Sequence, residues 1–111
     1  TSEAASPSPG MLAQHYAPRT PLALANEVDL AAQRNSEQRL GAMALSSLDE
    51  PSAFEAHEIL APDGDLTIAA AEFFAALRRL DAAGLDRIIA WPFPDAGLGR
   101  ALNDRLRRAR H

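Results

Sequence analysis

The chain has 111 residues and a formal net charge of −4, which is the size of a single domain. It contains no cysteine, and this excludes a disulfide scaffold, a thiolate metal site and cysteine catalysis. The acidic balance argues against a domain that coats nucleic acid, and no apolar run approaches the roughly 20 residues of a membrane helix. Because 47% of residues are hydrophobic but only 5% are aromatic, we expect a core of small side chains.

Residues 1–20 differ from the rest in composition, and we interpret them as a linker that precedes a domain at residues 21–111. Proline is frequent in this segment, and it removes backbone donors and disfavours regular structure, as in a tether or a surface arm. Met11, His15 and Tyr16 are nevertheless unusual in a pure spacer. Since the sequence begins with Thr1 and not with Met, we expect it to be part of a longer protein.

The first half of the domain contains short apolar runs separated by residues that favour turns, and this pattern predicts short strands. Residues 21–25 predict a strand, and residues 28–38 predict a short helix. The continuous run of small apolar side chains at 40–45 predicts a strand buried on both faces. A turn-rich loop at 46–52 leads to a third strand at 54–60, whose mixed composition places it near an edge.

Two helices and one strand are predicted in the second half. Apolar side chains spaced three and four apart predict a helix over 65–83, with Asp65 as its N-cap and Gly84 as its stop. Residues 87–91 predict a buried strand, and residues 97–110 predict the last helix. The inward positions expected in the two helices are Leu66, Ala70, Phe73, Leu77 and Leu80, and then Leu98, Ala101, Leu102, Leu106 and Ala109.

The alternation of strands and helices predicts an α/β fold. Parallel pairing follows because each crossover needs about a dozen residues. The expected architecture is a small three-layer α/β/α sandwich, Rossmann-like, with a mostly parallel sheet of four to five strands.

The domain itself offers few side chains suited to catalysis or metal binding, and we assign it no catalytic residue and no metal site. Glu55 and His57 share a strand face, but a metal site needs a third ligand that the spacing does not supply. The pair at Gly97 and Gly99 departs from the dinucleotide fingerprint because Leu102 stands where its third glycine belongs. We interpret these features as an exposed strand face and a tight strand-to-helix connection.

Five arginines lie between residues 100 and 110, against one acid, Asp104. Arg100, Arg107 and Arg108 are candidate contacts for RNA phosphates. A solvated helix face is the favoured interpretation, because no aromatic side chains are interleaved for base stacking.

The linker carries a more specific pattern. Residues 8–18 contain Ser-Pro-Gly-Met, three further residues and then His-Tyr-Ala-Pro. This segment resembles the interdomain linker of two-domain threonylcarbamoyl-AMP synthases, the longer relatives of the YrdC proteins. Downstream positions resemble the C-terminal domain of that family in order and spacing, from Phe74 and Asp81 through Gly97 to Asn103 and Ala109, so that the likeness extends from Ser8 to Ala109.

The resemblance implies an enzyme that makes L-threonylcarbamoyladenylate from threonine, bicarbonate and ATP with release of pyrophosphate, for the modification of tRNA to threonylcarbamoyladenosine. The chemistry, with ATP and Mg²⁺, would belong to an N-terminal YrdC-like catalytic domain that is absent from this chain. The chain alone should therefore be inactive and hold no cofactor. Its partners would be that domain and the tRNA-modification machinery, in the cytoplasm and without a membrane.

By the same resemblance, the linker would cover the active site of the missing domain as a lid. The residues carried over to this role are Ser8, Pro9, Gly10, Met11, His15, Tyr16, Ala17 and Pro18. A linker that merely docks the two domains together is the alternative role. For the whole chain, the alternative function is a free-standing α/β module that binds a protein or RNA without catalysis.

Overall fold

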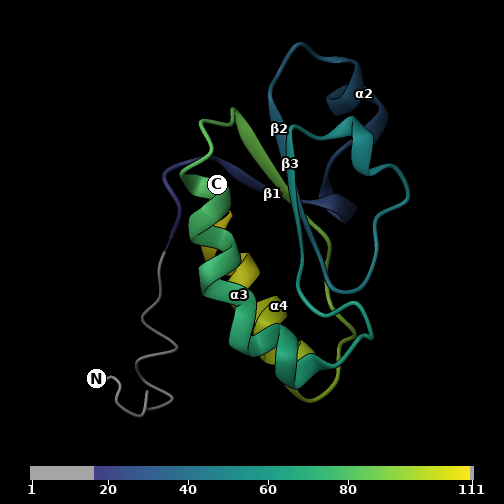
Figure 1. Ribbon diagram of the computed structural model, residues 1–111, viewed down its shortest axis with the longest axis vertical. Helices are drawn as coiled ribbons and strands as arrows, with labels where there is room; N and C mark the ends of the chain where they lie inside the picture. The colour runs from purple at the N-terminus through teal and green to yellow at the C-terminus, as the bar shows by residue number, and fades with distance from the viewer. Residues whose placement is uncertain (1–16, 111) are drawn as a thin grey trace.

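A parallel four-stranded sheet in the order β1-β4-β2-β3 forms the centre of the molecule in the computed structural model, which describes residues 17–110 (Figure 1). The predicted α/β fold with a parallel sheet is confirmed, as is the edge position of the third strand. The elements are β1 (Leu22–Leu24), η1 (Ala25–Glu27), α2 (Leu30–Asn35), β2 (Leu40–Ala44), η2 (Pro51–Ala53), β3 (Ala56–Ile59), α3 (Leu66–Asp81), β4 (Arg87–Ala90) and α4 (Leu98–Ala109).

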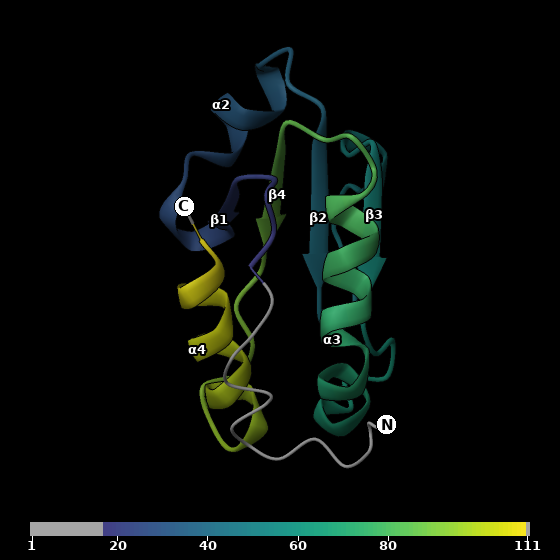
Figure 2. The same cartoon turned by 90° about the vertical axis from the view of Figure 1, so that its left-hand side faces the viewer.

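The sheet is covered on both faces, which gives the expected three layers. Helices α3 and α4 pack side by side on one face (Figure 2), in a core that includes Phe73, Leu77 and Leu106. The short helix α2 covers the other face together with the segments around η1 and η2, and a smaller core there contains Phe54 and Ile89. The central strands β2 and β4 are therefore buried on both sides, as the continuous apolar composition of residues 40–45 predicts.

Helix α3 follows its predicted pattern closely. The Asp65 side chain caps its start by accepting hydrogen bonds from the backbone N–H groups of Thr67 and Ile68 at 2.8 and 3.4 Å. Phe73, Leu77 and Leu80 are buried as expected, whereas Leu66 and Ala70 are only half-buried. Gly84 adopts a positive φ of 72° just beyond the helix and turns the chain towards β4.

The first helix is shorter than residues 28–38. Asp29 caps α2 by accepting a hydrogen bond from the Ala32 N–H at 3.1 Å, and the Ser36 hydroxyl donates to the Gln33 carbonyl at 2.6 Å and ends the helix. The segment before it is a 3₁₀ turn, η1. A second 3₁₀ turn, η2, begins inside the predicted loop, and β3 starts only at Ala56.

The inward face of α4 agrees with the prediction at Leu102, Leu106 and Ala109, which are buried, and differs in the first turn of the helix. Leu98 is 44% exposed and Ala101 is exposed, while Gly99 and Asn103 take inward positions. The cause is steric, because a Cβ at residue 99 would lie 1.8 Å from the Pro94 carbonyl oxygen. The first turn of α4 lies against the chain at Pro94 through a glycine, and this contact rotates Leu98 and Ala101 outward.

We predict that Gly99→Ala lowers the free energy of unfolding by about 3 kcal/mol, because overpacking against rigid backbone cannot relax. Urea denaturation followed by circular dichroism measures the change. Gly64→Ala is the matched control, since Gly64 has a positive φ of 80° but a Cβ placed there would meet no atom within 4 Å. Equal losses in the two variants would show that the contact with Pro94 is unimportant.

Candidate functional site

The structure describes the predicted linker only from residue 17 onward, and residues 17–20 are called the linker root below. Ala17 is exposed and Pro18 is buried, whereas the predicted positions Ser8, Pro9, Gly10, Met11, His15 and Tyr16 lie outside the described residues. From residue 17 the chain runs into β1 close to the carboxyl-terminal end of α3 (Figures 1 and 2).

Asp81, the last residue of α3, holds this root. Its carboxylate accepts hydrogen bonds from the backbone N–H groups of Arg19 and Thr20 at 3.2 and 2.9 Å, and from the Thr20 hydroxyl at 2.7 Å. A carboxylate is electrostatically unfavourable at the carboxyl end of a helix, where the dipole is negative. Three donors from the linker root offset this effect, so Asp81 fixes the point at which the linker leaves the domain.

We predict that Asp81→Asn destabilises the chain by about 1–2 kcal/mol, because the amide cannot accept all three hydrogen bonds. The amide protons of Arg19 and Thr20 should then exchange faster with solvent, as measured by hydrogen exchange. Asp63→Asn, in an exposed turn, is the control and should leave both rates unchanged. Thr20→Val removes one donor and should give a smaller effect; unaltered exchange in both linker-root variants would contradict the anchoring role.

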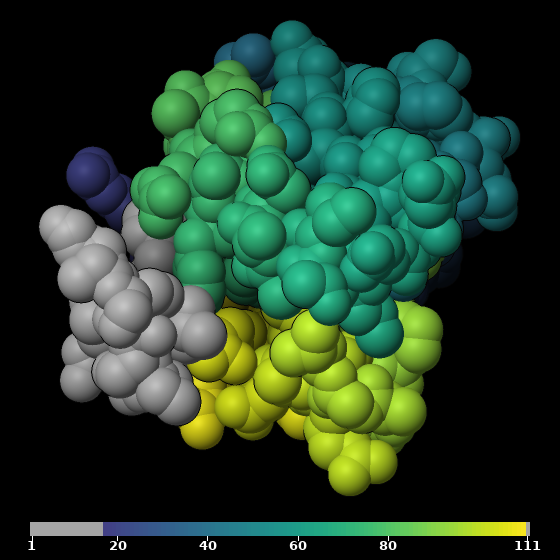
Figure 3. All heavy atoms as spheres, turned by 60° about the horizontal axis from the view of Figure 1, so that its bottom comes forward, coloured from purple at the N-terminus to yellow at the C-terminus, as the bar shows by residue number. Residues whose placement is uncertain are grey.

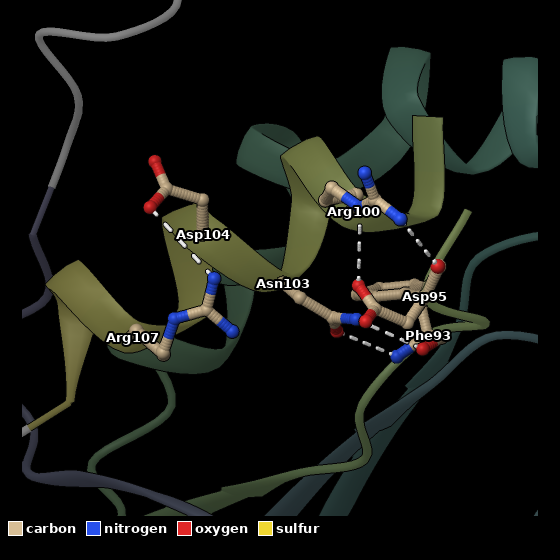
Figure 4. A network of polar contacts seen from close by, with 6 residues as sticks. All are labelled: Phe93, Asp95, Arg100, Asn103, Asp104 and Arg107. Atoms are coloured by element: carbon tan, nitrogen blue, oxygen red, sulfur yellow. Dashed lines mark hydrogen bonds and ion pairs between the residues drawn. The ribbon is translucent and has the colours of Figure 1, made fainter. Parts of the chain in front are cut away.

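A crevice of about 300 Å³ lies near the carboxyl ends of β1 and β4, between η1, α4 and the segment after β4. Asn103 forms one wall and is buried. It accepts a hydrogen bond from the Phe93 N–H at 2.8 Å and donates one to the Phe93 carbonyl at 2.9 Å (Figure 4). Asn103 therefore pairs with this backbone as a neighbouring strand would, and it holds the β4–α4 connection against the helix.

Replacing Asn103 with Ala should cost about 3 kcal/mol of unfolding free energy, because it leaves a buried N–H and a buried carbonyl of Phe93 without partners. Thermal and urea denaturation measure this loss. Asn26→Ala, at an exposed position of the same crevice, should change stability by less than about 0.5 kcal/mol. A loss for Asn103→Ala as small as that of the control would show that the paired bonds contribute little.

Four of the five arginines between residues 100 and 110 have acidic partners within the domain, and Arg105 donates a hydrogen bond to the Ala101 carbonyl at 3.2 Å. Arg100 lies 3.5 Å from Asp95, Arg107 and Arg108 lie 3.9 and 3.2 Å from Asp104 (Figure 4 shows the first two pairs), and Arg110 lies 2.6 Å from Glu27. Exposed pairs of this kind stabilise a fold only slightly. Their acids lower the net positive charge of the helix, which weakens the case for phosphate binding; contact with RNA stays a prediction.

The candidate ligands on the third strand also pair with arginines or face solvent. Glu55 precedes β3 and lies 3.3 Å from Arg39, and His57 is exposed. The Arg79 guanidinium donates a hydrogen bond to the neighbouring Glu58 carboxylate at 2.8 Å, and this contact raises the pKa of Arg79 above its ordinary value. Within residues 17–110, no three His, Cys, Asp or Glu side chains converge in an arrangement that could hold a metal ion.

An apolar groove of about 90 Å³ lies between α3 and α4, the two helices that run side by side in Figure 3. Phe74, Leu98 and Ala101 line it, with the side chain of Arg105 at its edge. The outward rotation of Leu98 and Ala101 thus places apolar surface on this face. In the part of the chain that is described, no helix is long and apolar enough to cross a membrane.

Sequence reasoning missed the structural roles of Asp81 and Asn103. Both residues belong to the pattern that resembles the synthase family, but the periodicity of the helices assigns them no contact. A signal was present in each case, because Asn103 interrupts an apolar helix face and Asp81 stands at the helix end that disfavours an acid.

The geometry defines a class of protein: a small parallel α/β domain in which the backbone just before β1 is held by a carboxylate at the end of α3. A sequence model of the threonylcarbamoyl-AMP synthase C-terminal domain matches residues 1–110. The threonylcarbamoyl-AMP synthase of Bacillus subtilis (strain 168) is 33% identical over 110 residues, covering 92% of this chain and 31% of the relative.

Solved structures agree with this match. The crystal structure of P. abyssi Sua5 complexed with L-threonine has a TM-score of 0.67 and 27% identity, covering 86% of this chain and 29% of that one. A P. abyssi Sua5 variant with a His and a Tyr replaced by Ala has a TM-score of 0.61 and 23% identity, covering 81% and 28%. The chain therefore belongs to the family of threonylcarbamoyl-AMP synthase C-terminal domains, and it spans about a third of the length of the curated relative.

Proposed function

We propose that this chain is the C-terminal domain and linker of an enzyme that forms L-threonylcarbamoyladenylate from threonine, bicarbonate and ATP, with release of pyrophosphate. Its relative in Bacillus subtilis is named for this activity, and P. abyssi Sua5 binds L-threonine. The chemistry belongs to an N-terminal YrdC-like catalytic domain, and the product serves tRNA modification in the cytoplasm. This chain acts as the accessory part.

The linker acts as a lid over the catalytic cleft of that domain. The observation that carries this proposal is the anchoring of Arg19 and Thr20 on Asp81, because a lid needs a fixed base from which its free part can close. Closure excludes water, which would otherwise hydrolyse the mixed anhydride of the product. His15 and Tyr16 contact the ligands or the cleft wall, and Met11 packs as an adaptable apolar plug.

The described residues of this chain do not fit a Mg²⁺ site, since no acidic cluster converges among them. We therefore assign Mg²⁺ and the ATP phosphates to the catalytic domain and derive no step through a metal here. The contribution of this chain is binding and exclusion of water, with no proton transfer or nucleophile supplied by residues 17–110.

Pyrophosphate release by the full-length product of the gene tests this proposal. We predict that replacing His15 and Tyr16 together by Ala lowers the rate of threonine-dependent release by about 10- to 100-fold, as expected when substrate positioning is lost. His57→Ala, an exposed residue of β3, is the matched control and should retain full activity. An unchanged rate in the double variant would contradict the lid, and activity of the 111-residue chain alone would contradict the accessory role.

A further inference from the structure

A second crevice, of about 200 Å³, opens on the α2 face of the sheet, between α2 and the segment that joins β2 to β3. The rings of Phe54 and Trp91 line it and meet edge to face, with centroids 5.8 Å apart and an interplanar angle of 86°. Leu30 from α2 and Leu48 from the loop after β2 add aliphatic walls. Since Trp91 is half-buried, part of its indole remains available to a ligand.

Part of the lining comes from the segments that follow two neighbouring strands, with Ser47 to Glu50 after β2 and Trp91 after β4. Beyond β4 the chain crosses to the α3–α4 face, whereas beyond adjacent β2 it passes over the α2 face, where Leu48 and Phe54 join the smaller core (Figure 1). A crevice forms between neighbouring strands whose connections diverge in this way, and ligands of open α/β sheets bind there. Residues 19 and 20 are held by Asp81 of α3, on the opposite face of the sheet, so the crevice is separate from them.

The charges at the rim restrict the ligand. Arg34 and Glu50 form an ion pair of 2.7 Å that joins α2 to the loop after β2, and the exposed Asp49 adds a second carboxylate. One arginine against two acids leaves the rim negative. The carboxylates of this rim repel phosphate and accept hydrogen bonds from the hydroxyl groups of a ligand. The Ser47 hydroxyl supplies a further hydrogen-bonding group.

We propose that this crevice binds an uncharged purine nucleoside, with the base stacked on Trp91 and the ribose hydroxyls donating to Asp49. A planar heterocycle can stack on the half-buried indole of Trp91 between the aliphatic walls, and a purine offers the larger stacking face. A rim carboxylate that accepts from a cis-diol is suited to ribose. Phosphorylated forms bind more weakly because their charge has the same sign as the rim.

The fluorescence of Trp91 tests the proposal directly, because it is the only tryptophan of the chain. The 111-residue chain is titrated with adenosine, AMP and ribose, with excitation at the red edge of the indole band so that the purine does not absorb. We expect saturable quenching by adenosine, binding of AMP about fivefold weaker, and no change with ribose. Absence of saturation with adenosine, or AMP binding as tightly as adenosine, would overturn the proposal.

Variants separate stacking from charge. Asp49→Asn should bring the affinities for adenosine and AMP closer together, whereas Asp95→Asn, an exposed acid of the other crevice, should leave both unchanged. Trp91→Leu keeps an apolar side chain, and ligand-observed NMR should show loss of adenosine binding while circular dichroism shows a retained fold. Unreduced binding in Trp91→Leu would refute the stacking. These assays use no catalytic domain, so their outcome is independent of the synthase proposal.

Discussion

The burial of β2 and β4 on both faces is the constraint on which the other features depend. Every side chain of β2 is buried, and β4 is buried except at its first residue, Arg87. Close packing requires a glycine at one position of β2, because a Cβ at Gly41 would lie 2.4 Å from a methyl group of Leu85. Backbone groups enclosed in this way must pair with each other, and the parallel ladder satisfies them. The two central strands consequently carry no polar side chain apart from Arg87.

The amino edge serves as the attachment point of the linker. Asp81 stands at the end of α3, where the chain turns towards β4, and it receives the donors of Arg19 and Thr20 just before β1 begins. One carboxylate thus joins two segments that are 61 residues apart in the sequence. In our proposal this fixed base lets a linker of defined length reach the cleft of a catalytic domain, so the accessory domain contributes to catalysis through geometry.

The segments that follow β2 and β4 help to line two crevices, one beside α4 and one on the α2 face of the sheet. On the α4 side, the polar atoms of Asn103 are already engaged with the Phe93 backbone, so that this wall is structural. On the α2 side, the rings of Phe54 and Trp91 lie below a rim of charged and hydroxyl groups. The contrast explains why we place a ligand in the second crevice, since a binding site needs an open stacking face and acceptors that its own fold does not consume.

The sequence alone determined the order of the main elements, the parallel sheet, the edge position of β3 and the family, because hydrophobic periodicity and the linker motif are local properties. The short helix α2 and the two 3₁₀ turns escaped prediction in detail, since single caps such as Asp29 set their bounds. The tertiary structure alone decided how the first turn of α4 is oriented, through the contact between Gly99 and Pro94, and which acid holds residues 19 and 20. These depend on distances between segments far apart in the chain, which no local pattern encodes.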